Sequence, residues 1–224
     1  VRRHLSAIKG GQLAAAAERT ITLAISDVIR PEDDDPLTIG SGPTVADHTT
    51  FAEALEVIER AGLQREMPEA VMRHLRAARP AERGGPALAG QSAYWIVGSR
   101  QDAMRAAADT ARQIGYDVHV HAPAIDGEAR EAPATLMAHA SSVTRPGCII
   151  ASGETTVRVT GKGKGGRNQE LAVASLERLR ALGPSALASI GTDGVDGPTD
   201  AAGGMVDRSE EHTSELPSRF GISY

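Results

Sequence analysis

Apolar and polar positions follow two patterns in the first part of the chain, one typical of a strand and one typical of helices. Residues 20–29 form a short apolar run rich in β-branched side chains, which predicts a buried strand. Apolar residues at helical spacing predict helices over 51–61 and 68–78, with Thr50 or its neighbour Thr49 as the first N-cap. Periodicity is lost over the Gly- and Pro-rich residues 79–90, which we interpret as a linker or a domain crossover.

After residue 90 the strand-like and helix-like patterns alternate regularly. Apolar runs predict strands and longer amphipathic stretches predict helices; the strands are 93–98, 117–122, 148–151, 155–160 and 186–191, and the helices are 101–114, 127–142 and 168–182. Strands separated by helices of this length pair in parallel through right-handed crossovers. The fold class is therefore α/β, with layered sheets that are mostly parallel and a mixed edge at 155–160.

Composition and charge narrow the function classes. With 41% hydrophobic and 24% charged residues among 224, the chain is typical of a globular protein, and Trp95 is expected in its core. A net charge of −5 gives no field that would gather nucleic acid or an anionic membrane, so neither partner is expected. The single cysteine, Cys148, cannot form an internal disulfide, which favours a cytoplasmic protein and a buried strand thiol.

Both ends of the sequence differ from natural termini. The chain begins with Val1 rather than Met, which indicates a piece of a longer reading frame. Residues 208–218 abandon the preceding composition and resemble a translated sequencing-library adapter, apart from Pro217. We interpret 208–224 as a non-native tail, with a polar native tail as the alternative.

The first loop that could bind a ligand runs from Gly161 to Glu170, between an expected strand and an expected helix. Its glycines free the backbone to turn N–H groups inward, its cations add positive charge, and the following helix points its positive end at the same place. This pattern favours a phosphate or a carboxylate, and it fits neither a Walker loop nor a dinucleotide fingerprint. A solvated basic loop is the alternative.

The second loop, Gly191–Asp200, follows the last predicted strand. Ligands bind at that end of parallel α/β sheets. Asp193, Asp196 and Asp200 could hold Mg²⁺, orient a hydroxyl or shape turns, and their spacing does not fit an EF-hand.

Three further candidates carry weaker signals. Ser26-Asp27 and the small-residue segment 39–44 suit either ligand approach or a routine tight connection. His119 and His121 share one face of a strand, but two histidines without a third ligand are expected to form local hydrogen bonds rather than a zinc site.

Six motifs in order resemble those of one known family. They are His4–Gly11, Ile25–Val28, Ser41–Thr44, Gly153–Val157, Gly165–Glu170 and Thr192–Gly203. They resemble the glycerate 2-kinases with a MOFRL C-terminal domain, some of which carry the older label hydroxypyruvate reductase. The resemblance covers residues 1 to about 207, and its main departure is Ala151-Ser152 where the family usually has Ser-Gly.

The resemblance implies transfer of the γ-phosphoryl group of Mg-ATP to the 2-hydroxyl of D-glycerate, in a cleft between two α/β domains. It implies that Arg167 is the catalytic arginine and that Asp193 orients or deprotonates the hydroxyl. Substrate or nucleotide contacts are implied at Ser41, Gly42, Thr44, Glu154, Lys162, Lys164, Gly165, Gly166, Asn168, Thr192 and Asp196. Asp196 is also a candidate metal or water ligand, and the metal ligands as a set stay unassigned.

The family's upstream half, which bears a catalytic lysine, is not in this sequence. We therefore expect residues 1–88 to be part of an incomplete first domain, 89–207 to be the MOFRL-like domain, and the fragment to be inactive alone. Residues 1–78 should be less stable than 91–207 and should leave a sheet edge uncovered. A homodimer stays open, as do an NAD(P)H-dependent hydroxypyruvate reductase and a non-catalytic metabolite-binding domain.

Overall fold

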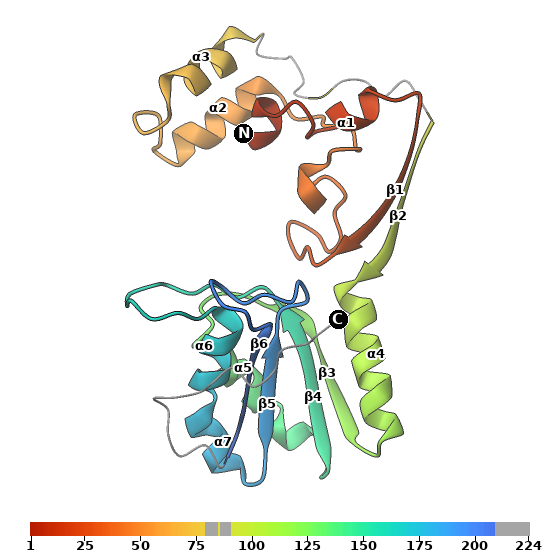
Figure 1. The fold of residues 1–224 in the computed structure, drawn as a ribbon, viewed down its shortest axis with the longest axis vertical. Helices are drawn as coiled ribbons and strands as arrows, with labels where there is room; N and C mark the ends of the chain where they lie inside the picture. The colour runs from red at the N-terminus through yellow and green to blue at the C-terminus, as the bar shows by residue number, and fades with distance from the viewer. Residues whose placement is uncertain (79–84, 86–90, 209–224) are drawn as a thin grey trace. The chain divides into compact units, whose positions relative to one another are not determined.

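The computed structural model describes residues 1–78, 85 and 91–208, and it divides the chain into two compact units (Figure 1). Unit 1 is Val1–Arg100 and unit 2 begins at Gln101. The division falls later than the boundary expected between residues 88 and 89. The reason is that the strand expected at 93–98 pairs within unit 1. None of the described helices has the length and apolar content needed to cross a bilayer.

Unit 1 contains one pair of parallel strands and several short helices. Strand β1 (Arg19–Ser26) pairs with β2 (Gln91–Ser99), with a register shift after Ala24. The helices are η1 (Arg2–Leu5), α1 (Gln12–Ala15), η2 (Ile39–Ser41), α2 (Phe51–Arg60) and α3 (Glu69–Ala77). The predicted strand and both predicted helices of this part of the chain are therefore confirmed.

Helices α2 and α3 form the core of unit 1. Thr50 begins α2 with a capping box, in which its hydroxyl accepts from the Glu53 backbone N–H at 3.2 Å and its own N–H donates to Glu53 at 2.6 Å. The apolar stripe of α2, including Phe51 and Ile58, packs on Met72 and Leu75 of α3. Amphipathic spacing in the sequence thus becomes one buried cluster.

Strands β1 and β2 contribute little to that core. Ile21, Leu23 and Ile25 are 68%, 66% and 80% exposed, and Trp95 on β2 is 52% exposed. The strand at 20–29 forms as predicted, but the expectation that it is buried is wrong, as is the core position of Trp95. The physical reason is that these side chains lie on a sheet of only two described strands, whose apolar face nothing described covers.

Unit 2 is a layered α/β unit. Its elements are α4 (Arg100–Gln113, whose first residue belongs to unit 1), β3 (Asp117–Ile125), α5 (Ala132–Ala138), η3 (Ala140–Ser142), β4 (Gly147–Gly153), α6 (Arg167–Ala174), α7 (Leu176–Leu182), β5 (Ala186–Ile190) and β6 (Gly203–Asp207). Strands β3 and β4 pair in parallel, whereas β5 and β6 are antiparallel. Helix α6 packs against β5 and β6, and buried clusters join these helices to the strands. The predicted α/β class is correct.

Several predicted elements of unit 2 need correction. Residues 155–160 do not form a strand, because Thr156 makes only an isolated bridge to Glu128 and Val159 is 79% exposed. The helix expected over 127–142 is reduced to α5 and η3. The helix expected over 168–182 is divided at Ser175, whose hydroxyl donates to the Leu171 carbonyl at 2.8 Å.

Strand β6 was not predicted. It is antiparallel to β5, and Val206 is fully buried in a cluster with Leu179 of α7. Cys148 lies half-buried in β4, where burial raises the pKa of its thiol, as expected for an unreactive strand cysteine. The interpretation of residues 208–224 as a tail falls, apart from Arg208, outside the described residues.

Candidate active site

The two loops singled out in the second half of the sequence meet at the start of α6. The carboxylate of Asp196 accepts hydrogen bonds from the backbone N–H of Asn168 at 3.0 Å and of Gln169 at 2.8 Å. It also accepts from the side-chain amide of Asn168 at 3.0 Å. A buried carboxylate thereby satisfies the free N–H groups of the first turn and favours the positive end of the helix.

Glycines make this close contact between the loops sterically feasible. A side chain on Gly166 would collide with the Asp196 carboxylate, and one on Gly197 would collide with the Gly165 carbonyl. Gly197 also has a φ of 63°, which side chains rarely adopt. The glycine-rich loop and the acidic bend are therefore packed directly on each other.

Arg167 is the first residue of α6, and its guanidinium reaches back to the end of β4. Its Nη1 donates to Glu154 Oε1 at 3.0 Å and to the Thr155 carbonyl at 3.5 Å. Both contacts use one nitrogen, so within the described part of the chain Nη2 and Nε carry no hydrogen bond. The side chains of Arg167 and Glu154 are 38% and 53% exposed, so the pair is reachable from solvent. A fixed cation with free donors suits an anionic ligand.

Asp193 and Thr192 are exposed at the tip of the acidic bend. Asp193 Oδ1 accepts a long hydrogen bond of 3.4 Å from the Val195 N–H. A methyl group placed on Gly191 would lie 2.9 Å from this oxygen and 3.3 Å from the Asn168 amide nitrogen. Asp193 thus lies near the start of α6 while its carboxylate stays open to solvent, which suits a group that accepts a proton.

Asp196 has a different environment from Asp193. It is 2% exposed and both of its oxygens are engaged by α6. The Asp196 side chain therefore holds the acidic bend against α6. Its buried and occupied oxygens do not suit the metal or water ligand that was expected at 196.

Other side chains complete the junction and were not singled out from the sequence. Ser189 on β5 donates to the Asn168 side-chain oxygen at 2.7 Å, which fixes the orientation of that amide. Gln169 donates to the hydroxyl of Thr199 at 3.0 Å, and that hydroxyl donates to the Asp196 carbonyl at 2.7 Å. The sequence offered one signal, since Gln169 lies in the motif Gly165–Glu170 and Thr199 in the motif Thr192–Gly203. Lys162 and Lys164 are exposed and make no hydrogen bond or ion pair with described residues.

Ser41, Gly42 and Thr44 lie in unit 1. Ser41 has a φ of 67° between two left-handed glycines, and its carbonyl accepts from the Gly10 N–H at 3.1 Å. The Gly42 carbonyl accepts from the Gly11 N–H at 2.8 Å, and the Thr44 hydroxyl accepts from Thr22 at 2.8 Å. The structure therefore joins the first and third sequence motifs, and the ligand roles of these residues stay predictions.

Comparisons with known proteins agree with this arrangement of motifs. Residues 1–76 match the family described as "Domain of unknown function (DUF4147)", and residues 147–217 match the MOFRL family. The MOFRL match extends past residue 207, into the segment interpreted as a non-native tail.

Two individual relatives are similar to this chain over most of its length. The chain is 36% identical to a D-glycerate 2-kinase of Thermotoga maritima over 222 residues, which are 95% of this chain and 51% of that protein. It is 40% identical over 218 residues to an Agrobacterium vitis protein that carries the name of a hydroxypyruvate reductase, covering 92% of this chain and 48% of that protein.

A crystal structure of glycerate kinase from Thermotoga maritima has a similar fold. It aligns with a TM-score of 0.74 and 36% identity, over 93% of this chain and 50% of that one. The chain thus spans about half the length of these relatives.

Proposed function

This chain belongs to the glycerate 2-kinase family with a MOFRL domain, and from that membership we propose that it serves to transfer the γ-phosphoryl group of ATP to the 2-hydroxyl of D-glycerate. The products are 2-phosphoglycerate and ADP. Glycerate and ATP are the small-molecule partners of this proposal. A cytoplasmic location is part of it, supported by the single half-buried cysteine.

The observation that carries the proposal is the position of Arg167. It begins α6, and Glu154 holds its guanidinium at the exposed start of that helix. Phosphoryl transfer gains most from cations that are in place before charge develops on the transferred group. The free donors of Arg167 suit the oxygens of that group or the glycerate carboxylate.

Asp193 suits the role of proton acceptor. In the proposed reaction the 2-hydroxyl oxygen bonds to the γ-phosphorus, the bond from that phosphorus to the ADP oxygen breaks, and the hydroxyl proton passes to the Asp193 carboxylate. Its exposed carboxylate at the tip of the bend favours this assignment over the buried Asp196.

The family implies a Mg²⁺ ion with the nucleotide. Mg²⁺ binds one or two carboxylates together with phosphate oxygens and water. The exposed carboxylate of Asp200 fits that requirement and leaves Asp193 free to accept the proton, whereas Asp196 does not fit because α6 occupies its oxygens. The ion would neutralise charge on the phosphates.

The test is an assay of ADP release from ATP and D-glycerate by the full-length protein. Arg167→Ala should lower kcat by about 100-fold or more, because a preorganised charge contact is lost. Arg178→Ala is the matched control, since Arg178 is an exposed arginine of α7 in the same unit. A kcat within twofold of the parent for Arg167→Ala would refute the role of Arg167.

The same protein preparation distinguishes a kinase from the alternative, a hydroxypyruvate reductase. A hydroxypyruvate reductase would oxidise NADH in the presence of hydroxypyruvate, and it would need a dinucleotide turn that the glycine-rich loop does not provide. NADH oxidation without ADP release would replace the kinase by the reductase. Binding of ATP and glycerate without either reaction would indicate a metabolite-binding protein.

A further inference from the structure

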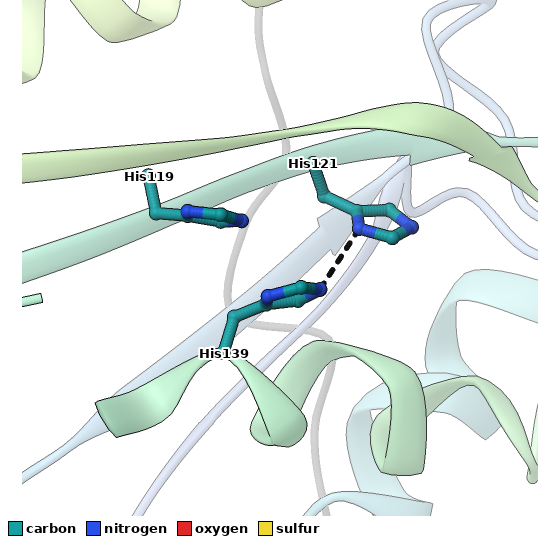
Figure 2. A group of neighbouring side chains, drawn as sticks. All are labelled: His119, His121 and His139. Carbon is teal, nitrogen blue, oxygen red and sulfur yellow. Dashed lines mark hydrogen bonds between the residues drawn. The ribbon is translucent and has the colours of Figure 1, made fainter. Parts of the chain in front are cut away.

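Three histidine side chains meet on one face of β3, as Figure 2 shows. His119 and His121 are two residues apart on the strand, and His139 is the residue that ends α5. The His121 Nδ1 lies 3.0 Å from Nε2 of His139, and the His119 and His139 rings stack with centroids 4.3 Å apart. One ring nitrogen from each histidine lies within 4.8 Å of the other two.

We propose that His119, His121 and His139 bind a divalent transition-metal ion of the zinc class. Imidazole nitrogens are preferred ligands of Zn²⁺, Ni²⁺ and Cu²⁺. Two nitrogens bound tetrahedrally to zinc at about 2.0–2.1 Å lie about 3.4 Å apart. The pair at 3.0 Å is already near that spacing, and the proposal requires the His119 ring to turn out of its stack on His139 so that its nitrogen joins them. Three protein ligands leave a fourth position for water or another ligand.

The strand geometry explains why these side chains converge. Alternate residues of a strand project from the same face, so His119 and His121 point together toward the segment that carries His139. Cys148 of β4 pairs in register with Val118, so its thiol projects from the opposite face and is not a ligand. The proposed site is therefore a three-histidine site.

The partial burial of the three rings is compatible with metal binding. All three are half-buried, which leaves an approach for an ion. The hydrogen bond between His121 and His139 uses only two rings, whereas a metal ion uses all three.

An ion at this position would connect β3 to the α5–η3 segment. Ligands that bind only the folded state raise its stability by mass action. The full chain should therefore melt at a higher temperature in the presence of zinc than after treatment with a chelator.

The experiment is a titration of the chelator-treated full chain with Zn²⁺ by calorimetry, and with Co²⁺ by visible absorption. We expect one ion at this site, the d–d bands of a tetrahedral cobalt complex, and a rise in Tm. His139→Ala should abolish all three signals. His48→Ala, which changes an exposed histidine of unit 1, should retain them.

A second variant keeps the test decisive if His139→Ala fails to fold. His121→Gln retains a polar side chain of comparable length, and circular dichroism establishes that the variant is folded. Loss of the cobalt bands in folded His121→Gln supports the site. Absence of the bands in the parent chain, or their persistence in either variant, would overturn the proposal.

Discussion

Asp196 connects the two loops of the candidate site through hydrogen bonds that only a carboxylate satisfies. Asp196→Asn replaces one acceptor oxygen by an N–H₂ group, which then faces an N–H donor from α6. Leaving a buried group unsatisfied costs about 1–3 kcal/mol, and the loss of negative charge at the helix start adds to this. Urea unfolding followed by circular dichroism measures the effect.

Asp200→Asn provides the matched control for this prediction. Asp200 belongs to the same bend but is exposed, so its substitution should leave the unfolding midpoint unchanged. If the two variants unfolded at the same urea concentration, the capping role of Asp196 would be wrong.

His4 makes the stability of unit 1 depend on pH. It is 6% exposed, its Nε2 lies 3.1 Å from the Thr49 hydroxyl, and its Nδ1 has no hydrogen-bond partner among the described residues. Burial lowers the pKa of His4. The unfolded chain takes up a proton at the ordinary pKa of about 6.5, but the folded chain does so only at lower pH. Stability is therefore complete above about pH 6.5 and falls as the pH decreases below it.

Urea unfolding followed by circular dichroism measures this effect, because His4 packs on Phe51 of helix α2. The urea midpoint should be lower at about pH 5.5 than at about pH 7.5, which lie on either side of the ordinary histidine value. His4→Gln should reduce that difference, whereas His48→Gln should not. An equal difference in both variants would assign the pH effect to other groups.

At the scale of elements, helices with a local signal were the most predictable. Helix α2 has both an apolar stripe and a capping residue at Thr50, and the structure reproduces both. Strand β6 begins with Gly203-Gly204, which in sequence is typical of a turn, and it exists because β5 offers a partner. Residues 155–160 show the reverse case. Their alternating pattern predicts a strand, but no partner strand pairs with them in the described chain. Whether a segment forms a strand depends on a partner strand, and the local sequence does not encode that partner.

The same distinction applies to the site. Proximity of the glycine-rich loop and the acidic bend was predictable, because both adjoin elements of one α/β unit. That Asp196 caps α6 was not, since it depends on how two loops fold against each other. His139 lies 18 residues from His121 and belongs to no motif with it, so only the packing of α5 on β3 reveals the cluster.

At the scale of the whole molecule, the two units have differently built cores. The cluster of unit 1 lies between α2 and α3, and no described residue of β1 or β2 belongs to it. The clusters of unit 2 join helices to strands through Ile125, Leu187 and Val206. An isolated two-stranded sheet is only marginally stable, so β1 and β2 should be the weakest part of the described fold.

This difference predicts two unfolding transitions in denaturant. Trp95 on β2 should change its fluorescence at a lower urea concentration than the circular dichroism of the helices in unit 2, because the β1–β2 pair separates first. Leu179→Ala removes a fully buried side chain of α7 and should cost unit 2 about 2–5 kcal/mol, lowering the second midpoint and sparing the fluorescence transition. Coincident transitions in the parent chain, shifted together by Leu179→Ala, would instead establish that the chain unfolds as one cooperative unit.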